Sequence, residues 1–221
     1  MTFGAPLLLL TLLAVPLAVG LYLFAERRRM RYAVRYTRGR EVFAVGARDA
    51  PLTLDCELRG RRLPPLGPAP RVASRVGLER NPVDLRDPDA RDWLRALTFP
   101  DHVARFARLD KAIEAFDGAA SDIRAGDALS LLPDALAAPP ADAPVCVYHT
   151  LALYQFTEEM RQAFDAILTL AGVRRPVWRI SLEGTLSGDN PLLLYSYRDG
   201  RRHKRTLARC NSHGAWLEWL E

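Results

Sequence analysis

Apolar and polar residues alternate with a period of two in the first part of the chain, between residues 31 and 58. The alternation runs over residues 32–36, 42–46 and 52–56, and Arg38-Gly39 provides a turn after the first run. A period of two is typical of half-buried strands. The pattern therefore predicts a small antiparallel meander.

From residue 75 onward, short apolar runs alternate with patterns of helical spacing. Asp87-Pro88 marks the start of one helix, and Thr157 caps another that ends before Gly172. Strands are expected at 75–79, 123–125, 145–148 and 177–182, helices at 87–97, 102–116, 131–137 and 157–171, and a terminal hairpin at 192–197 and 206–210. This succession predicts an α/β fold whose parallel sheet has helical crossovers and an antiparallel edge.

Two predictions concern burial. The helix that begins at Asp87 is expected to bury Trp93, Leu94 and Leu97. The run from Val145 to Tyr148 lacks alternation, which is typical of a strand that is buried on both faces.

An uncharged segment extends from Ala5 to Ala25. About 20 helical residues, each adding about 1.5 Å, reach roughly 30 Å, which is the thickness of the hydrocarbon core of a bilayer. A transmembrane helix is the leading interpretation, and residues 1–30 are expected to form an anchor with a basic flank. The alternatives are a cleaved signal peptide, a buried helix of a globular core, and a strand of the sheet formed by residues 15–24.

Seven arginines lie directly after this segment, between Arg27 and Arg40. The positive-inside rule places such a cluster in the cytoplasm. We therefore expect a single-pass protein of the cell membrane, held in the lipid bilayer through residues 5–25, with residues 31–221 in the cytoplasm. The arginine cluster and the run from Arg201 to Arg205 are candidates for contact with anionic lipid headgroups.

The charge distribution and the cysteines exclude several other classes. The 221-residue chain carries a net charge of +5, and the positive excess lies in two arginine clusters rather than along the whole chain. This pattern argues against a nucleic-acid-binding protein. Cys56, Cys146 and Cys210 are too few and too far apart for a disulfide framework or a CxxC metal site, and the four histidines lack metal-binding spacing. No metal site is predicted.

The N-terminal segment resembles that of a known protein class. Phe3, Pro6, the leucine run, Pro16 and the arginine cluster are similar to the opening of bacterial membrane-anchored von Willebrand A-domain proteins of the aerotolerance-regulator type. The resemblance covers only about residues 1–36. The D-x-S-x-S metal-binding loop of that domain is not found downstream, so its function does not carry over.

Five motifs in the rest of the chain share a second resemblance. They are Arg48–Glu57, Arg75–Asp84, Gly126–Leu129, Val147–Thr150 and His213–Trp219. Together they resemble an uncharacterised bacterial family of unknown function that is similar in turn to S-adenosylmethionine-dependent methyltransferases. The resemblance covers about residues 31–221 and implies a Rossmann-like methyltransferase sheet.

The resemblance also implies a cofactor site. In such a fold the ligand lies at the carboxyl ends of the strands. Glu79 would hold the ribose hydroxyls of S-adenosylmethionine, Asp127 would accept from the adenine amino group, and His149 would border the methyl group and its acceptor. From local sequence alone, the alternative interpretations are a solvated strand end, a turn residue and a core histidine, respectively.

One part of the expected site departs from the family pattern. A full-length relative carries a strand that ends in a glycine turn of the G-A-S-A-G-L-N-L kind just before the position of Arg31-Tyr32. Residues 17–24 occupy that place here, and only Gly20-Leu21 and Leu23 correspond. We therefore expect a Rossmann-like sheet that lacks its first strand and glycine loop.

The leading functional hypothesis is a membrane-anchored, methyltransferase-like protein that uses S-adenosylmethionine. The alternatives are a non-catalytic binding module or remnant that has lost the cofactor site, and a truncated chain that folds poorly.

Overall fold

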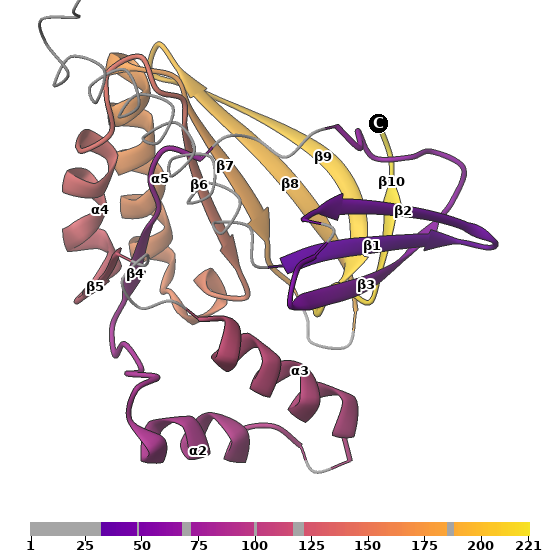
Figure 1. Ribbon diagram of the computed structural model, residues 1–221. Helices are drawn as coiled ribbons and strands as arrows, with labels where there is room; N and C mark the ends of the chain where they lie inside the picture. Colours follow the sequence, from indigo (N-terminus) through magenta and orange to yellow (C-terminus); the bar gives the residue numbers. More distant parts are fainter. Residues whose placement is uncertain (1–31, 48, 68–71, 100, 117–121, 185–187) are drawn as a thin grey trace, which may run out of the picture.

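The computed structural model describes residues 32–47, 49–67, 72–99, 101–116, 122–184 and 188–221 (Figure 1). The predicted transmembrane segment, residues 5–25, lies outside this part of the chain. None of the helices within the described ranges is long and apolar enough to cross a bilayer.

A large mixed sheet forms the main layer of the fold (Figure 1). Its strands, in chain order, are β1 (Tyr32–Arg38), β2 (Glu41–Gly46), β3 (Leu52–Arg59), β6 (Val145–Thr150), β7 (Val177–Leu182), β8 (Asp189–Arg198), β9 (Arg201–Asn211) and β10 (Trp216–Trp219). They lie side by side in the order β2-β1-β3-β10-β9-β8-β7-β6. A second sheet consists of the parallel strands β4 (Val76–Glu79) and β5 (Asp122–Ala125).

The helices are α2 (Pro88–Ala96), α3 (Val103–Ala115), α4 (Ala128–Ala137) and α5 (Glu158–Arg174), and η2 (Leu153–Gln155) is a short 3₁₀ turn. Local capping accounts for three of the helix starts. The side chain of Asp87 accepts a hydrogen bond from the backbone of Asp89, and Asp127 and Thr157 cap α4 and α5 in the same way. The predicted helices are thus confirmed, with small differences at their ends.

The predicted antiparallel meander is only half right. β1 and β2 form an antiparallel hairpin, but β3 pairs with β1 in the parallel direction. The loop that follows β2 carries the chain back across the end of the hairpin, so that β3 enters the sheet on the other side of β1. The alternation of residues identified the strands correctly, but it does not determine whether neighbouring strands run parallel or antiparallel.

The strands of the terminal hairpin lie inside the sheet, whereas the sequence had suggested that they form its antiparallel edge. β8 pairs with β7 and β9, and β9 pairs with β10, all in the antiparallel direction. The predicted terminal hairpin is confirmed and is longer than expected. The parallel pair β6–β7 lies at one end of this antiparallel region.

Two parallel strand edges face the same hydrophobic core. Among the described residues, β4 pairs only with β5, and β6 pairs only with β7. Leu78 of β4 packs against the cluster that contains Val145 of β6. The two sheets therefore share one core although no described strand joins them.

The core lies between the β6–β9 region and the helices α4 and α5. It contains Leu132, Leu136, Phe164, Leu168, Val177 and Tyr197. Gly172 was expected just after the helix but lies inside α5, where a Cβ atom would come within 2.8 Å of the Cβ of Tyr197. Glycine at this position lets α5 lie directly on β8.

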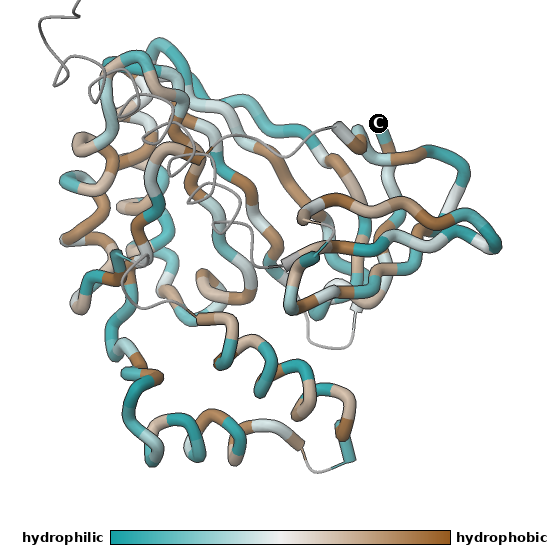
Figure 2. The backbone as a smooth tube through the Cα atoms, in the orientation of Figure 1, coloured by the Kyte–Doolittle hydropathy of each residue, from teal (hydrophilic) through white to brown (hydrophobic). Residues whose placement is uncertain are grey.

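The predicted burial of α2 and β6 is wrong in part. Trp93 is 64% exposed and Leu97 is 63% exposed, because α2 belongs to a helical hairpin that contributes no buried residue. Figure 2 shows apolar segments alternating with polar ones along this hairpin. On β6, Val145 is buried but Tyr148 is 78% exposed, since the described helices cover only one face of that strand.

Candidate functional site

Glu79 and Asp127 lie at neighbouring strand ends. Glu79 is the last residue of β4 and is in register with Ala125, the last residue of β5. The carbonyl oxygen of Glu79 accepts a hydrogen bond from the backbone N–H of Gly126 at 3.0 Å. Asp127 follows directly, so the sequence-predicted pair of acidic residues is brought together at one edge of the small sheet.

Both carboxylates are exposed and make local hydrogen bonds. Glu79 accepts from the backbone N–H of Asn81 at 3.1 Å. One oxygen of Asp127, Oδ2, accepts from both the backbone N–H and the hydroxyl of Ser130 at 2.8 Å. These bonds from Ser130 lower the pKa of Asp127. Asp127 is therefore a helix cap as well as a candidate ligand-binding residue.

The end of β6 lies on the same side of the fold as these residues. The β5-α4-β6 segment is a helical crossover, and such crossovers connect parallel strands. In Figure 1 the chain leaves β4 and β6 toward the end of the molecule where α2 and α3 lie. His149, near the end of β6, thus belongs to the same edge of the α/β layer.

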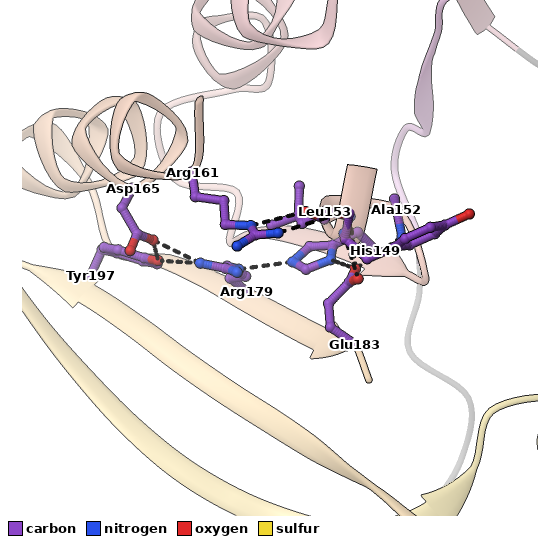
Figure 3. Close-up of polar contacts among 9 residues, drawn as sticks. His149, Ala152, Leu153, Arg161, Asp165, Arg179, Glu183 and Tyr197 are labelled. Atoms are coloured by element: carbon purple, nitrogen blue, oxygen red, sulfur yellow. Dashed lines mark hydrogen bonds and ion pairs between the residues drawn. The ribbon is translucent and has the colours of Figure 1, made fainter. Parts of the chain in front are cut away.

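His149 is held at the centre of a polar network (Figure 3). Its Nδ1 lies 2.6 Å from Glu183 Oε1, and its Nε2 accepts a hydrogen bond from Arg179 Nε at 2.9 Å. Because a guanidinium can only donate, Nε2 is the acceptor, and Nδ1 carries the proton that it donates to Glu183. Burial and the nearby Arg179 charge lower the pKa of His149, although Glu183 opposes the shift.

Arg179 connects this histidine to helix α5. Its guanidinium donates to Asp165 Oδ1 at 2.7 Å and lies between the rings of Phe164 and Tyr195, 5.0 Å and 4.6 Å from their centres. The hydroxyl of Tyr197 also donates to Asp165, at 2.8 Å. Burial raises the pKa of Tyr197 to about 12, so this phenol keeps its proton.

Glu183 fixes the loop that follows β6. Its carboxylate accepts the backbone N–H groups of Ala152 and Leu153 at 3.0 and 3.1 Å and that of Tyr154 at 3.2 Å. These bonds and His149 lower the pKa of Glu183, although burial opposes the shift. Leu151 adopts a left-handed backbone conformation with φ of 49°, which is rare for a residue with a branched side chain. Glu183 thus stabilises a strained loop at the edge of the candidate site.

Sequence reasoning missed four members of this network: Asp165, Arg179, Glu183 and Tyr197. One signal was available. Glu183 follows the strand Val177–Leu182 directly, as Glu79 ends the strand Val76–Glu79, and an acidic residue at a strand end is what the family resemblance implied for Glu79. Arg179 carries no such signal, because an arginine in an alternating strand is usually on the solvent face.

The network holds side chains and the following loop in place, and it has no group arranged to transfer a proton. Both ring nitrogens of His149 have partners within the protein, so the resting arrangement contains no free imidazole base. The loop above it is rigidly held and presents Tyr154, which is 60% exposed. No group of three or more metal-ligating side chains occurs among the described residues.

The lowered pKa of His149 predicts that acid destabilises the fold. The unfolded chain binds a proton at histidine near its ordinary value of 6.5, whereas the folded protein resists protonation. Stability from this group is thus full above about pH 6.5 and is lost as the pH falls toward the lower folded value; Glu183 adds a further loss below about 4.5. The melting temperature, followed by circular dichroism, should fall over this range.

The variant His149→Gln should flatten the upper part of this pH dependence, because it removes the titrating group. His203→Gln is the matched control, since His203 is exposed on β9. An unchanged slope in His149→Gln would contradict the assignment of the acid transition to this network.

Comparison with known proteins gives one match. The family model described as "Uncharacterized protein conserved in bacteria (DUF2332)" matches residues 10–219. The matched range includes all the elements of the candidate site and begins within the apolar segment 5–25. No curated protein and no solved structure matches the chain.

Proposed function

Since the chain belongs to this bacterial family, DUF2332, we propose that it binds S-adenosylmethionine and supports methyl transfer from a Rossmann-like domain. One observation carries the proposal. The parallel strands β4 and β5 end in register, so Glu79 and Asp127 lie at adjacent strand ends, and ligands of open α/β sheets bind at the carboxyl ends of the strands.

The chemistry of these residues fits the nucleoside part of the cofactor. Ionised carboxylates only accept hydrogen bonds, whereas ribose hydroxyls and the adenine amino group donate them. Glu79 would hold the ribose hydroxyls and Asp127 the amino group. The bound cofactor supplies an electrophilic methyl group. The chain's own part is to bind and orient the two reactants, and placement alone supplies a large share of such a rate.

The loop 151–154 would border the reacting groups. It lies at the end of β6, and the carboxylate of Glu183 holds three of its backbone N–H groups. In the proposed function, His149 stabilises this loop indirectly, because it donates a hydrogen bond to Glu183. Arg179 fixes the tautomer of His149 by donating to its Nε2 atom. A loop held in this way needs little reorganisation when a substrate binds.

Binding of S-adenosylmethionine to the full chain is the direct test. We expect Glu79→Gln to weaken binding by about tenfold, because a charge-assisted hydrogen bond contributes about 1.5–3 kcal/mol. Asp127→Ser should have a similar effect while retaining the helix cap, since serine caps helices as well as aspartate does. Isothermal titration calorimetry measures both affinities.

Glu41→Gln is the matched control for these variants. Glu41 is an exposed carboxylate on β2, paired with Arg38, and the α/β edge does not include it. Absence of heat with the wild-type chain at millimolar S-adenosylmethionine would contradict the proposal, as would equal binding by the wild type and the two site variants.

A non-catalytic binding module is the second candidate. It is favoured by the histidine network, in which neither nitrogen of His149 is free to accept a proton. This alternative, in which the cofactor site has been lost, predicts that the chain neither binds S-adenosylmethionine nor produces S-adenosylhomocysteine. The calorimetric titration, followed by a turnover assay on any protein that binds, separates the two candidates.

We also propose that residues 5–25 anchor the protein in the cell membrane, with the α/β domain in the cytoplasm. The support is the uncharged length of this segment and the arginine cluster that follows it. Within the run Arg201–Arg205, Arg202 pairs with Asp165 and Arg205 with Glu221, so only part of the run is available for anionic headgroups. Retention in the pellet after an alkaline wash of membranes would support the anchor, and release would contradict it.

A further inference from the structure

A cavity of about 430 Å³ lies in the helical hairpin, between α2, α3 and the segment that precedes α2. Leu85, Ile113 and Phe116 provide its apolar lining. The cavity is large enough for a small organic molecule. The residues that line it are separate from the polar network of His149.

The hairpin itself is not part of the hydrophobic core. Neither α2 nor α3 contains a buried residue. Hydrophobic packing of the main core therefore does not explain the apolar residues that face the cavity. Binding sites often lie on surface segments outside the main core, and this hairpin with its own cavity is such a segment.

The arginines that line the cavity differ in whether a carboxylate neutralises them. Arg95 is neutralised by two carboxylates, Asp110 at 2.8 Å and Asp92 at 2.7 Å. Arg86 pairs with Asp84 at 3.0 Å. Two of the three arginines that line the cavity are thus already compensated.

Arg91 is different. It is half-buried and lines the cavity, and no hydrogen bond or ion pair of its guanidinium is found among the described residues. A partly desolvated guanidinium without a counterion favours an anion, and its planar set of donors matches a carboxylate in two-point contact. Glu114, also at the cavity, would disfavour a ligand with more negative charge.

We propose that this cavity binds a small organic carboxylate, with the carboxylate on Arg91 and an apolar body against Leu85, Ile113 and Phe116. The segment that lines the cavity is close in sequence to the candidate site at the end of β4, because Leu85 follows Glu79 by six residues. That the carboxylate compound is the methyl acceptor rests on the proposed function. Binding of the carboxylate compound to the cavity does not depend on the proposed function.

The test uses the full chain and 3-phenylpropionate as the probe. We expect the acid to bind at least about tenfold more tightly than 3-phenylpropionamide, the neutral compound of the same shape, and 3-phenylpropylamine to bind more weakly still. Arg91→Gln should reduce the affinity for the acid by about tenfold and leave that for the amide unchanged. Glu114→Gln should increase the affinity for the acid, because it removes a like charge.

Arg108→Gln is the matched control, since Arg108 is an exposed arginine of α3 that does not line the cavity. Circular dichroism checks that each variant is folded. Equal binding of acid and amide, an unchanged affinity in Arg91→Gln, or no binding of the acid would each overturn the proposal. Titration of the same samples with S-adenosylmethionine reports separately on the proposed function, so failure of one can be told from failure of the other.

Discussion

Arg179→Met is expected to lower the free energy of unfolding by about 2–3 kcal/mol, because removing one partner leaves buried polar groups with an unmet hydrogen bond. The side chain of Arg179 is only 9% exposed. Methionine would fill the space between Phe164 and Tyr195, but it would leave Asp165 and the Nε2 atom of His149 without this donor. Asp165 keeps Arg202 and Tyr197 as partners, so the loss should come mainly from the unpaired Nε2 atom of His149 and not from packing.

Urea unfolding followed by far-UV circular dichroism measures this change. Arg198→Met is the matched control. Arg198 stacks on Trp178, with 5.1 Å to the ring centre, much as Arg179 stacks on Tyr195, but Arg198 is exposed. The control should lose less than about 1 kcal/mol. Similar losses in both variants would show that stacking, and not the buried network, accounts for the contribution of Arg179.

Gly172→Ala is expected to destabilise the protein by about 2 kcal/mol. Alanine is the better helix former by about 1 kcal/mol, so an exposed glycine in a helix would gain from this change. At this position the new Cβ would lie 2.8 Å from the Cβ of Tyr197 and 2.9 Å from its backbone carbonyl carbon. The backbone of β8 cannot move aside cheaply, and overpacking of this kind costs about 3 kcal/mol, which decides the sign.

Thermal unfolding of Gly172→Ala and Gly77→Ala gives the comparison. At Gly77 a Cβ would meet its nearest neighbour, Ile123, at 3.5 Å, which is an ordinary contact. We expect Gly77→Ala to be neutral or slightly stabilising, because alanine reduces the conformational entropy of the unfolded chain. A Gly172→Ala variant as stable as the wild type would mean that α5 does not lie directly on β8.

Local features of the fold could be predicted from the sequence. The helix starts at Asp87 and Thr157 follow from capping, which involves residues only two or three positions apart. Period-two alternation located the strands of the β1–β3 region. Glu79 and Asp127 were instead identified through the family resemblance, and the structure brings the ends of their two strands together.

Non-local features could not be predicted in the same way. The parallel pairing of β1 with β3 and the internal position of β8 and β9 depend on contacts between distant residues, which a single sequence does not encode locally. The burial of Arg179 has the same origin. Its compensation comes from Asp165 on a helix and His149 on another strand, and only the folded arrangement brings these together. Trp93 is exposed because α2 belongs to a helical hairpin that contributes no buried residue, and the spacing of its apolar residues does not reveal this.

One edge of β6 has no partner strand among the described residues, and this has a consequence for handling the protein. Val145–Thr150 has no proline and no charged residue, and valine, tyrosine and threonine favour extended structure. Where such a segment presents backbone donors and acceptors to solvent, it is a template on which identical chains can stack into fibrils. Conditions that loosen the domain would thus make β6 the first point of polymerisation, and low protein concentration would be the simplest protection.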